Sequence, residues 1–287
     1  MTLDTIRTVA VLGAGTMGNG IAHVFARCGY NVILRDLEES LLTRARDTIA
    51  KNLDREAKKG KIAEGEQSKI LTHIHTTTDF SEIARADFAV EAVPERLDLK
   101  LSVLREADKL LRPGAILASN TSSISVTTLA AATSRPDRFI GMHFMNPVPV
   151  MPLIEVIRAL QTSEDTFQAT MALCERLEKK PVAVNDAPGF VSNRVLLPMI
   201  NEAAFAVMEG VATAEAVDSI MKLGMNHPMG PLELADFIGL DVCVHILDVL
   251  HDGFGDSKYR ACPLLRKMVA AGWLGRKSGR GFYAYAK

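Results

Sequence analysis

Short apolar runs alternate with longer amphipathic stretches along the first two thirds of the chain. Most of the runs are nearly continuous in apolar residues, which is typical of strands covered by helices on both faces. They predict strands at Thr8–Leu12, Asn31–Asp36, Ile74–Thr77, Asp87–Glu91, Ala115–Ser119, Phe139–His143, Leu153–Ile157 and Val182–Val184. The stretches between them predict helices, among them Met17–Cys28, Glu39–Lys59, Leu97–Leu111 and Glu164–Leu177. This alternation predicts a doubly wound α/β domain.

The pattern changes after Val184. Asp186-Ala187-Pro188-Gly189 is a turn signal, and residues 190–271 follow helical spacing. We therefore expect an α/β domain over residues 1–186 and a smaller all-helical domain over residues 187–287. The second domain carries broad apolar faces, for example at Val195 and Met199, which favour a homodimer. Packing of these faces within the chain is the alternative.

Composition and charge narrow the class of protein. The 287 residues are 48% hydrophobic and 23% charged, with a formal net charge of -1, so nothing in the balance suggests nucleic acid as a partner. The N-terminal run is too short for a signal peptide, and no window approaches a membrane span. The four cysteines are scattered singly, so we expect no disulfide framework and no metal site. These features favour the cytoplasm.

The hexapeptide Gly13-Ala14-Gly15-Thr16-Met17-Gly18 fits GxGxxG and lies between a predicted strand and a predicted helix. In a dinucleotide-binding loop the first glycine allows the turn, the second admits the pyrophosphate, and the third lets helix and strand pack closely. The helix N-terminus adds unpaired N–H groups. We therefore expect this Rossmann-type loop to bind the cofactor through Gly13, Gly15, Thr16, Met17 and Gly18.

Asp36 ends the next predicted strand, about 20 residues on, where the fingerprint places an acid. Its carboxylate can accept hydrogen bonds from an adenosine ribose and would repel a 2′-phosphate, which favours NAD over NADP. Arg35 beside it leaves NADP open, because an arginine there can accommodate the phosphate. A helix cap is the structural alternative for Asp36. Other chemistry is expected beyond the carboxyl ends of the strands, at Glu91–Glu95, Ser119–Ser122 and His143–Asn146.

Long segments of the chain resemble the 3-hydroxyacyl-CoA dehydrogenase family. They are GAGTMGNGIA, VEAVPE, SNTSSIS, RFIGMHFMNPVPVMPLIEVI, PGFVSNRVLLPMINEA and MKLGMNHPMGPLELADFIGLD. The resemblance runs from about Val9 to Gly279–Tyr285 and is greatest to stand-alone, short-chain members. It implies hydride transfer with NAD between an (S)-3-hydroxyacyl-CoA, such as 3-hydroxybutyryl-CoA, and the 3-oxoacyl-CoA, such as acetoacetyl-CoA.

Oxidation of a secondary alcohol needs a base, and histidine suits that role near neutral pH. His143 ends a predicted strand, and Glu155 lies twelve residues later on the next one, where it could return beside the imidazole. A lone strand-end histidine is more often structural, whereas a glutamate inside an apolar run is costly unless it is paired. The resemblance implies that His143 and Glu155 are the catalytic pair.

Further positions match the family's site. The resemblance implies that Ser122 bonds the substrate's 3-oxygen and that Asn193 holds the substrate from the helical domain, at an interdomain cleft. The alternatives are that Ser122 or Ser123 caps a helix near Ser125 and that Asn193 satisfies a buried backbone group. The resemblance also implies cofactor contacts for Glu95, Lys100 and Asn146, although Glu95 and Lys100 could equally form a solvated pair.

Coenzyme A carries phosphates that need an anchor. The predicted helix over Glu39–Lys59 is rich in basic residues, with Arg44, Lys51, Arg55 and Lys58 on roughly one face and Lys59 and Lys61 at its end. Such a face can hold phosphates, although it is usually only solvated. The resemblance implies CoA contacts at Asn52 and Lys59, and the basic face adds Lys51 as a candidate.

Two other functions compete with this assignment. A dehydrogenase of free β-hydroxy acids shares the two-domain plan but typically uses a lysine in its helical domain. A non-enzymatic NAD-binding relative, like the lens crystallins that resemble this family, would lack turnover. Retention of Ser122, His143, Glu155 and Asn193 together favours the enzyme.

Overall fold

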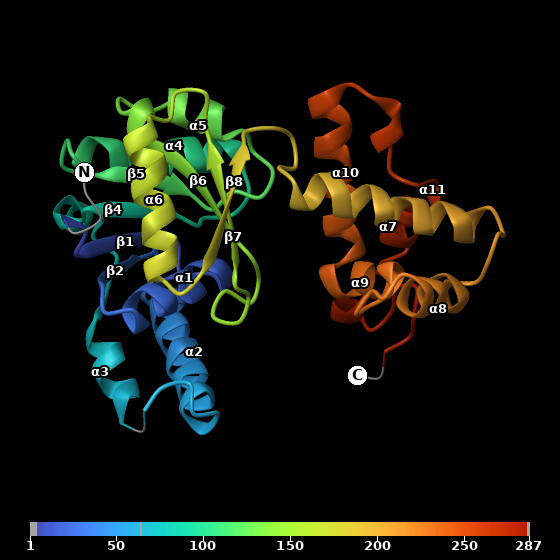
Figure 1. Cartoon of the computed structure of the whole chain (residues 1–287), viewed down its shortest axis with the longest axis horizontal. Coiled ribbons are helices and arrows are strands. Elements are labelled where there is room, and N and C mark those ends of the chain that lie inside the picture. The colour runs from blue at the N-terminus through green and yellow to red at the C-terminus, as the bar shows by residue number, and fades with distance from the viewer. Residues whose placement is uncertain (1–4, 64, 286–287) are drawn as a thin grey trace. The chain divides into compact units, whose positions relative to one another are not determined.

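A computed structural model of the chain describes residues 5–63 and 65–285 (Figure 1). The chain divides into two compact units, residues 1–186 and residues 187–287. Within the described residues, the first unit holds one eight-stranded sheet. Its strands are β1 (Thr8–Leu12), β2 (Asn31–Arg35), β3 (Ile74–Thr77), β4 (Phe88–Glu91), β5 (Ile116–Ser119), β6 (Phe139–Phe144), β7 (Leu153–Arg158) and β8 (Lys180–Asn185).

The strand order is β3-β2-β1-β4-β5-β6-β7-β8. Every neighbouring pair is parallel except β6 and β7, which run antiparallel. From β1 the chain first adds strands on one side and then, after β3, crosses back to add β4 on the other side. In an open α/β sheet this reversal point, outside the carboxyl ends of β1 and β4, is where a dinucleotide binds.

Helices cover both faces of the sheet, as the apolar strands require. The helices of this unit are α1 (Thr16–Arg27), α2 (Glu39–Lys58), α3 (Glu66–Thr72), α4 (Leu97–Leu110), α5 (Val126–Ala131) and α6 (Glu164–Arg176). Phe25 of α1, Leu53 of α2 and Phe167 of α6 pack in one core with Val9 and Val156 of the sheet. Figure 1 shows α2 reaching beyond the end of the sheet, with α3 beside it.

The second unit is helical. Its helices are α7 (Ser192–Met208), α8 (Ala214–Gly224), α9 (Pro231–Ile238), α10 (Leu240–Phe254) and α11 (Pro263–Ala270). They share a core of buried side chains, among them Leu197, Leu232, Leu247 and Leu265. None of the helices in the described parts of either unit is long and apolar enough to cross a membrane.

Two buried carboxylates bond residues 282–285 to the helices of the second unit. Asp236 of α9 accepts hydrogen bonds from the amides of Phe282 and Tyr283, each at 3.0 Å, and from the Tyr285 hydroxyl at 3.0 Å. Asp218 of α8 accepts from the Tyr283 hydroxyl at 2.7 Å. Burial and the bond to Asp236 raise the pKa of Tyr285 to about 12.

The expected fold class, a doubly wound α/β domain followed by a smaller helical one, is confirmed. The predicted strand ends agree with the observed ones to within two residues. The largest difference is at β8, which was expected over Val182–Val184 and spans Lys180–Asn185. This edge strand is mostly exposed. Its length is therefore set by pairing with β7 and not by the length of its apolar run.

Candidate functional site

The glycine loop between β1 and α1 has the geometry of a phosphate cradle. Gly13 has φ +107°, and a Cβ there would lie 2.7 Å from the carbonyl oxygen of Ala92. A Cβ at Gly18 would lie 1.8 Å from the Gly13 carbonyl oxygen, so this close approach requires glycine. At Gly15, in contrast, a Cβ would meet no atom within 4 Å, which leaves the backbone open to a ligand. No side chain of the described residues caps the N-terminus of α1, where unpaired N–H groups favour an anion.

Asp36 lies directly after β2, beside this loop. Its carboxylate accepts hydrogen bonds from the Ala14 amide at 2.6 Å and from the Leu37 amide at 2.6 Å. The N-cap of α2 is Glu38, so the alternative of a helix cap at Asp36 is wrong. The open backbone at Gly15, the uncapped helix and this carboxylate together fit a dinucleotide.

Arg35, the last residue of β2, stacks on Phe80. Its guanidinium carbon lies 4.4 Å from the centroid of that ring. The stacking holds the arginine side chain against Phe80 by a cation–π contact.

A dense polar network follows the ends of β4 and β5. One carboxylate oxygen of Glu95 accepts from the Thr121 hydroxyl at 2.5 Å and from the amides of Ser122 at 2.9 Å and Ser123 at 3.0 Å. The other lies 3.2 Å from the ammonium of Lys100. Burial acts to raise the pKa of Glu95, but Lys100 and these hydrogen bonds outweigh it, so the pKa lies below its usual value. Lys100 is only 1% exposed, so the alternative of a solvated pair is wrong.

Ser122 is partly exposed in the loop that Glu95 holds, and its hydroxyl lies 3.4 Å from the Glu95 carboxylate. The N-cap of α5 is Ser125, whose hydroxyl accepts from the Thr128 amide. The capping alternative for Ser122 is therefore wrong. Asn120, two residues earlier, accepts a hydrogen bond from the Phe144 amide at 3.0 Å and so ties this loop to β6.

His143 and Glu155 meet across the antiparallel pair of β6 and β7. They are register partners, and His143 Nδ1 lies 2.8 Å from Glu155 Oε2. The two side chains are largely buried, with 11% and 4% of their surfaces exposed. A carboxylate at Nδ1 fixes the imidazole tautomer and stabilises the imidazolium form, which suits a general base at Nε2. Asn146 lies two residues after the end of β6 and is exposed.

Comparison with known proteins gives the family. The model of the 3-hydroxyacyl-CoA dehydrogenase NAD-binding domain matches residues 8–187, and that of the family's C-terminal domain matches residues 189–285. The chain belongs to the 3-hydroxyacyl-CoA dehydrogenase family. It is therefore an NAD-dependent oxidoreductase, with the hydride-transfer chemistry that the resemblance implied.

Several relatives match this 3-hydroxyacyl-CoA dehydrogenase along nearly its full length. A probable 3-hydroxybutyryl-CoA dehydrogenase of Bacillus subtilis is 55% identical over 280 residues, which cover 98% of each chain. The 3-hydroxybutyryl-CoA dehydrogenase of Bradyrhizobium diazoefficiens is 51% identical, over 98% of this chain and 96% of that one. The crystal structure of (S)-3-hydroxybutyryl-CoA dehydrogenase from Ralstonia eutropha superposes with a TM-score of 0.96 at 51% identity, covering 99% of this chain and 100% of that one.

Other expected site residues of the dehydrogenase belong to α2 and to the second unit. Lys51 and Lys59 are exposed and Asn52 is partly buried, all on α2 or directly after it. Arg55 donates to the Asn52 side chain at 3.4 Å. Asn193 belongs to the second unit, where it is the second residue of α7 and donates its amide to the Gly189 carbonyl at 3.1 Å.

Two buried residues near this site were given no role from the sequence, although Glu91 opens the expected range Glu91–Glu95. Glu91, the last residue of β4, is fully buried beside Lys100. Lys179, which is 7% exposed, donates to the carbonyls of Val148 at 2.6 Å and Met151 at 2.8 Å, in the segment between His143 and Glu155. The cost of burying a lone charge, which singled out Glu155, applies equally to Glu91, whereas no sequence signal marks Lys179.

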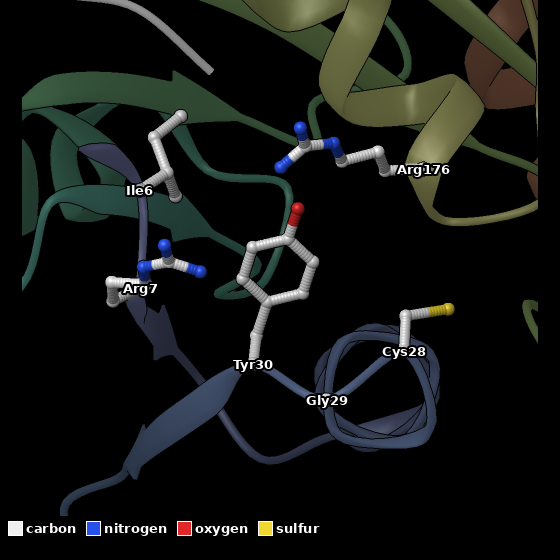
Figure 2. Close-up of a pocket in the computed structure, with 6 residues that line it drawn as sticks. All are labelled: Ile6, Arg7, Cys28, Gly29, Tyr30 and Arg176. Atoms are coloured by element: carbon white, nitrogen blue, oxygen red, sulfur yellow. The ribbon is translucent and has the colours of Figure 1, made fainter. Parts of the chain in front are cut away.

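A small cavity of about 180 Å³ lies elsewhere in the dehydrogenase. It is lined by Ile6, Arg7, Cys28, Gly29, Tyr30 and Arg176 (Figure 2). Arg7 directly precedes β1 and Tyr30 directly precedes β2, so the cavity lies at the amino ends of these strands. The carboxyl ends of the same strands carry Gly13 and Asp36. The cavity is therefore not the reaction site.

Proposed function

We propose that the chain interconverts (S)-3-hydroxybutyryl-CoA and acetoacetyl-CoA, with His143 as the acid and base. The observation that carries the proposal is the 2.8 Å contact of His143 Nδ1 with Glu155. His143 lies near the carboxyl end of β6, which runs parallel to β1 and so ends on the same side of the sheet as the glycine loop. The short-chain substrate rests on the relatives above 50% identity, which are named for 3-hydroxybutyryl-CoA.

In the oxidising direction, His143 Nε2 takes the proton of the substrate hydroxyl while Nδ1–H donates to Glu155. The Glu155 carboxylate keeps the tautomer with its acceptor at Nε2 and stabilises the imidazolium that forms. When NAD is bound, its nicotinamide accepts the hydride. In the reducing direction, the imidazolium returns the proton to the 3-oxygen. Ser122 donates a hydrogen bond to that oxygen, and Asn193 holds the substrate.

The cofactor is held by the carboxyl edge of the sheet. The glycine loop binds the pyrophosphate through the backbone of Gly13, Gly15, Thr16, Met17 and Gly18. Asp36 accepts from the adenosine ribose, and Arg35, which is stacked on Phe80, does not serve a 2′-phosphate. Glu95 and Asn146 line the nicotinamide end, and Lys100 acts there from within the protein through Glu95.

CoA binds along α2. Lys51 is exposed on this helix, Asn52 beside it is partly buried, and Lys59 is exposed at the C-cap. The two ammonium groups can form charge-assisted hydrogen bonds with phosphates. On this proposal residues 1–186 form the NAD-binding domain with a CoA-contacting helical arm. Residues 187–287 form the substrate and dimerisation domain.

The protein acts as a cytoplasmic homodimer on this proposal, with no nucleic-acid or membrane partner. Large apolar side chains lie exposed on the second unit, which favours a protein interface over solvent. They include Val195, Val211, Ile220, Leu223, Met225 and Phe237.

The test is the loss of NADH absorbance when purified protein meets acetoacetyl-CoA, repeated with His143→Ala. We expect turnover by the wild type and a loss of kcat of about 10³-fold or more in the variant. A wild type that binds NADH without turnover would indicate a non-enzymatic relative or another acyl substrate. Turnover of free 3-hydroxybutyrate with NAD, in the absence of CoA, would favour the free-acid dehydrogenase.

A further inference from the structure

Glu91 is a carboxylate in the middle of the sheet with no exposed surface. It ends β4, whose other residues, Phe88 to Val90, are apolar and buried. One carboxylate oxygen accepts from the Lys100 ammonium at 2.7 Å and from the Val93 amide at 2.7 Å. The other accepts from the Ser119 hydroxyl at 2.5 Å. Glu91 thus bonds its own following loop, the helix after it and the neighbouring strand.

A buried ion pair at this position costs free energy that apolar residues would not. Removing two charges from water costs several kcal/mol per ion, and well-packed apolar residues are often as stable or more so. Glu91 and Lys100 lie at the reversal point between β1 and β4, where the cofactor binds. A fully bonded polar network at such a place fixes one geometry of the groups around it.

One branch of the network leads to Ser122. Lys100 Nζ lies between Glu91, at 2.7 Å, and Glu95, at 3.2 Å. Glu95 in turn binds the amides of Ser122 and Ser123. The branch from Ser119 reaches the same loop, because the Ser119 hydroxyl also accepts from the Thr121 amide at 3.2 Å. Glu91 is therefore connected to the Ser122 loop in two ways, through Lys100 and Glu95 and through Ser119.

The other branch leads to the glycine loop. The Val93 amide, which donates to Glu91, would lie 3.1 Å from a Cβ at Gly13, and the Ala92 carbonyl oxygen would lie closer still. The backbone at residues 92 and 93 thus packs directly against the turn that receives the pyrophosphate. A shift of this backbone would displace Gly13.

We propose that Glu91 is a positioning residue of the reaction, which acts through Lys100 and Glu95 on Ser122 and through the Val93 amide on the glycine loop. It touches neither substrate nor cofactor. The expected effect of Glu91 on kcat rests on the function proposed above. The expected effect of Glu91 on NADH affinity does not depend on the role of Ser122.

The test is Glu91→Gln, which keeps the side-chain shape and removes the charge that pairs with Lys100. We expect kcat with acetoacetyl-CoA to fall about 10- to 100-fold and the Kd for NADH to rise about fivefold. The matched control is Asp108→Asn. Asp108 is also buried and pairs with Arg135 at 2.6 Å, but near the amino end of β5. This control should lose stability and keep both constants within about twofold.

A cycle with Ser122→Ala separates positioning from general destabilisation. If Glu91 acts through Ser122, Glu91→Gln should cost less than about threefold in kcat once Ser122 is alanine, because the loss is then shared. Equal losses in both backgrounds, together with an unchanged Kd for NADH, would overturn the proposal. An unchanged kcat in Ser122→Ala alone would refute the proposed role of Ser122, and the NADH Kd of Glu91→Gln would then decide for or against Glu91.

A second variant covers the case in which Glu91→Gln does not fold. The double substitution Glu91→Gln with Lys100→Met removes both buried charges, so it should fold. It also takes the ammonium away from Glu95, so its kcat should remain low. A folded double variant with wild-type kcat and NADH affinity would show that the pair is only structural, and the proposal would be wrong.

Discussion

His143 and Glu155 stand directly opposite each other on β6 and β7, with Nδ1 and Oε2 2.8 Å apart. Register partners of an antiparallel pair point to the same face of the sheet, so the hydrogen bonds between the strands set this contact. The orientation of the imidazole is therefore built into the sheet and needs no loop to close.

Replacement of Glu155 by glutamine tests the importance of that carboxylate. We expect Glu155→Gln to lower kcat by on the order of 10²- to 10⁴-fold, because an amide can hold the wrong tautomer and cannot stabilise the imidazolium. The KM for NADH should change little. The measurement is the steady-state rate with acetoacetyl-CoA, and circular dichroism checks the fold. A kcat within about threefold of the wild type would mean that Glu155 does not assist His143.

Asp36→Asn should weaken NADH binding and admit NADPH. The neutral amide can still accept from the Ala14 amide, so the loop should be kept, whereas a charge-assisted bond to the ribose is lost. We expect the KM for NADH to rise about tenfold and the ratio of kcat/KM for NADPH over NADH to rise by more. Rates with both cofactors measure this. Arg35→Gln is the companion variant: a selective loss of the NADPH rate in it would show that Arg35 does bind a phosphate.

Neutral residues at Lys51 and Lys59 should weaken CoA binding alone. For the double variant Lys51→Gln with Lys59→Gln we expect the KM for acetoacetyl-CoA to rise about tenfold and the Kd for NADH to stay unchanged. Lys109→Gln, an exposed lysine at the end of α4, is the matched control. Equal losses for both ligands in the double variant would place the CoA phosphates elsewhere.

Lys179 should make stability depend on pH above neutrality. Burial, with a smaller effect from the Arg27 charge, lowers the pKa of Lys179 to about 8. Between pH 8 and the usual lysine pKa of about 10.4, the unfolded chain binds more protons at this site, so stability should rise with pH. Relative to Lys179→Met, the wild type should gain on the order of 2 kcal/mol across this window. Urea unfolding at several pH values measures the difference, and the exposed Lys180→Met should show none.

The mass of the protein in solution tests the homodimer. Light scattering should give the mass of two chains. Ile220 and Leu223 lie three residues apart on α8 and are 59% and 88% exposed, so they share one apolar face. Their joint replacement by glutamate should shift the mass to one chain if this face is in the interface. A wild type with the mass of one chain would refute the dimer.

Much of the fold could be predicted from the sequence because both faces of the sheet are covered. Strand β1 is an almost continuous apolar run, and its predicted bounds match the observed ones. The predicted bounds of β3 match as well, although this edge strand is mostly polar and His75 is exposed. The glycine loop was equally predictable from the sequence. Close backbone contacts require glycine at positions 13 and 18, as in other dinucleotide-binding turns. The edge strand β8 was the least predictable, because its partner determines its length.

The polar network around the site could be predicted only in part. The twelve-residue spacing of His143 and Glu155 is compatible with a paired register, and the family resemblance supplied their roles. The bonds of Glu91 to Ser119 and Lys100 join residues 28 and 9 positions apart, and they depend on which strand lies next to β4. Strand order belongs to the tertiary structure, so spacing along the chain did not predict the buried bonds of Glu91. For the same reason a solvent-exposed pair of Lys100 with Glu95 stayed open as an alternative.

The buried Asp236 has a consequence for how this protein can be handled. Its carboxylate satisfies two backbone amides and one hydroxyl of residues 282–285. Truncation ahead of Phe282 would leave the Asp236 carboxylate without those donors in the interior of the second unit. The loss of stability should be comparable to that of a mutation in the core. The final segment is thus a structural component of the helical unit, and deletion scanning from this end should find an abrupt limit of tolerance there.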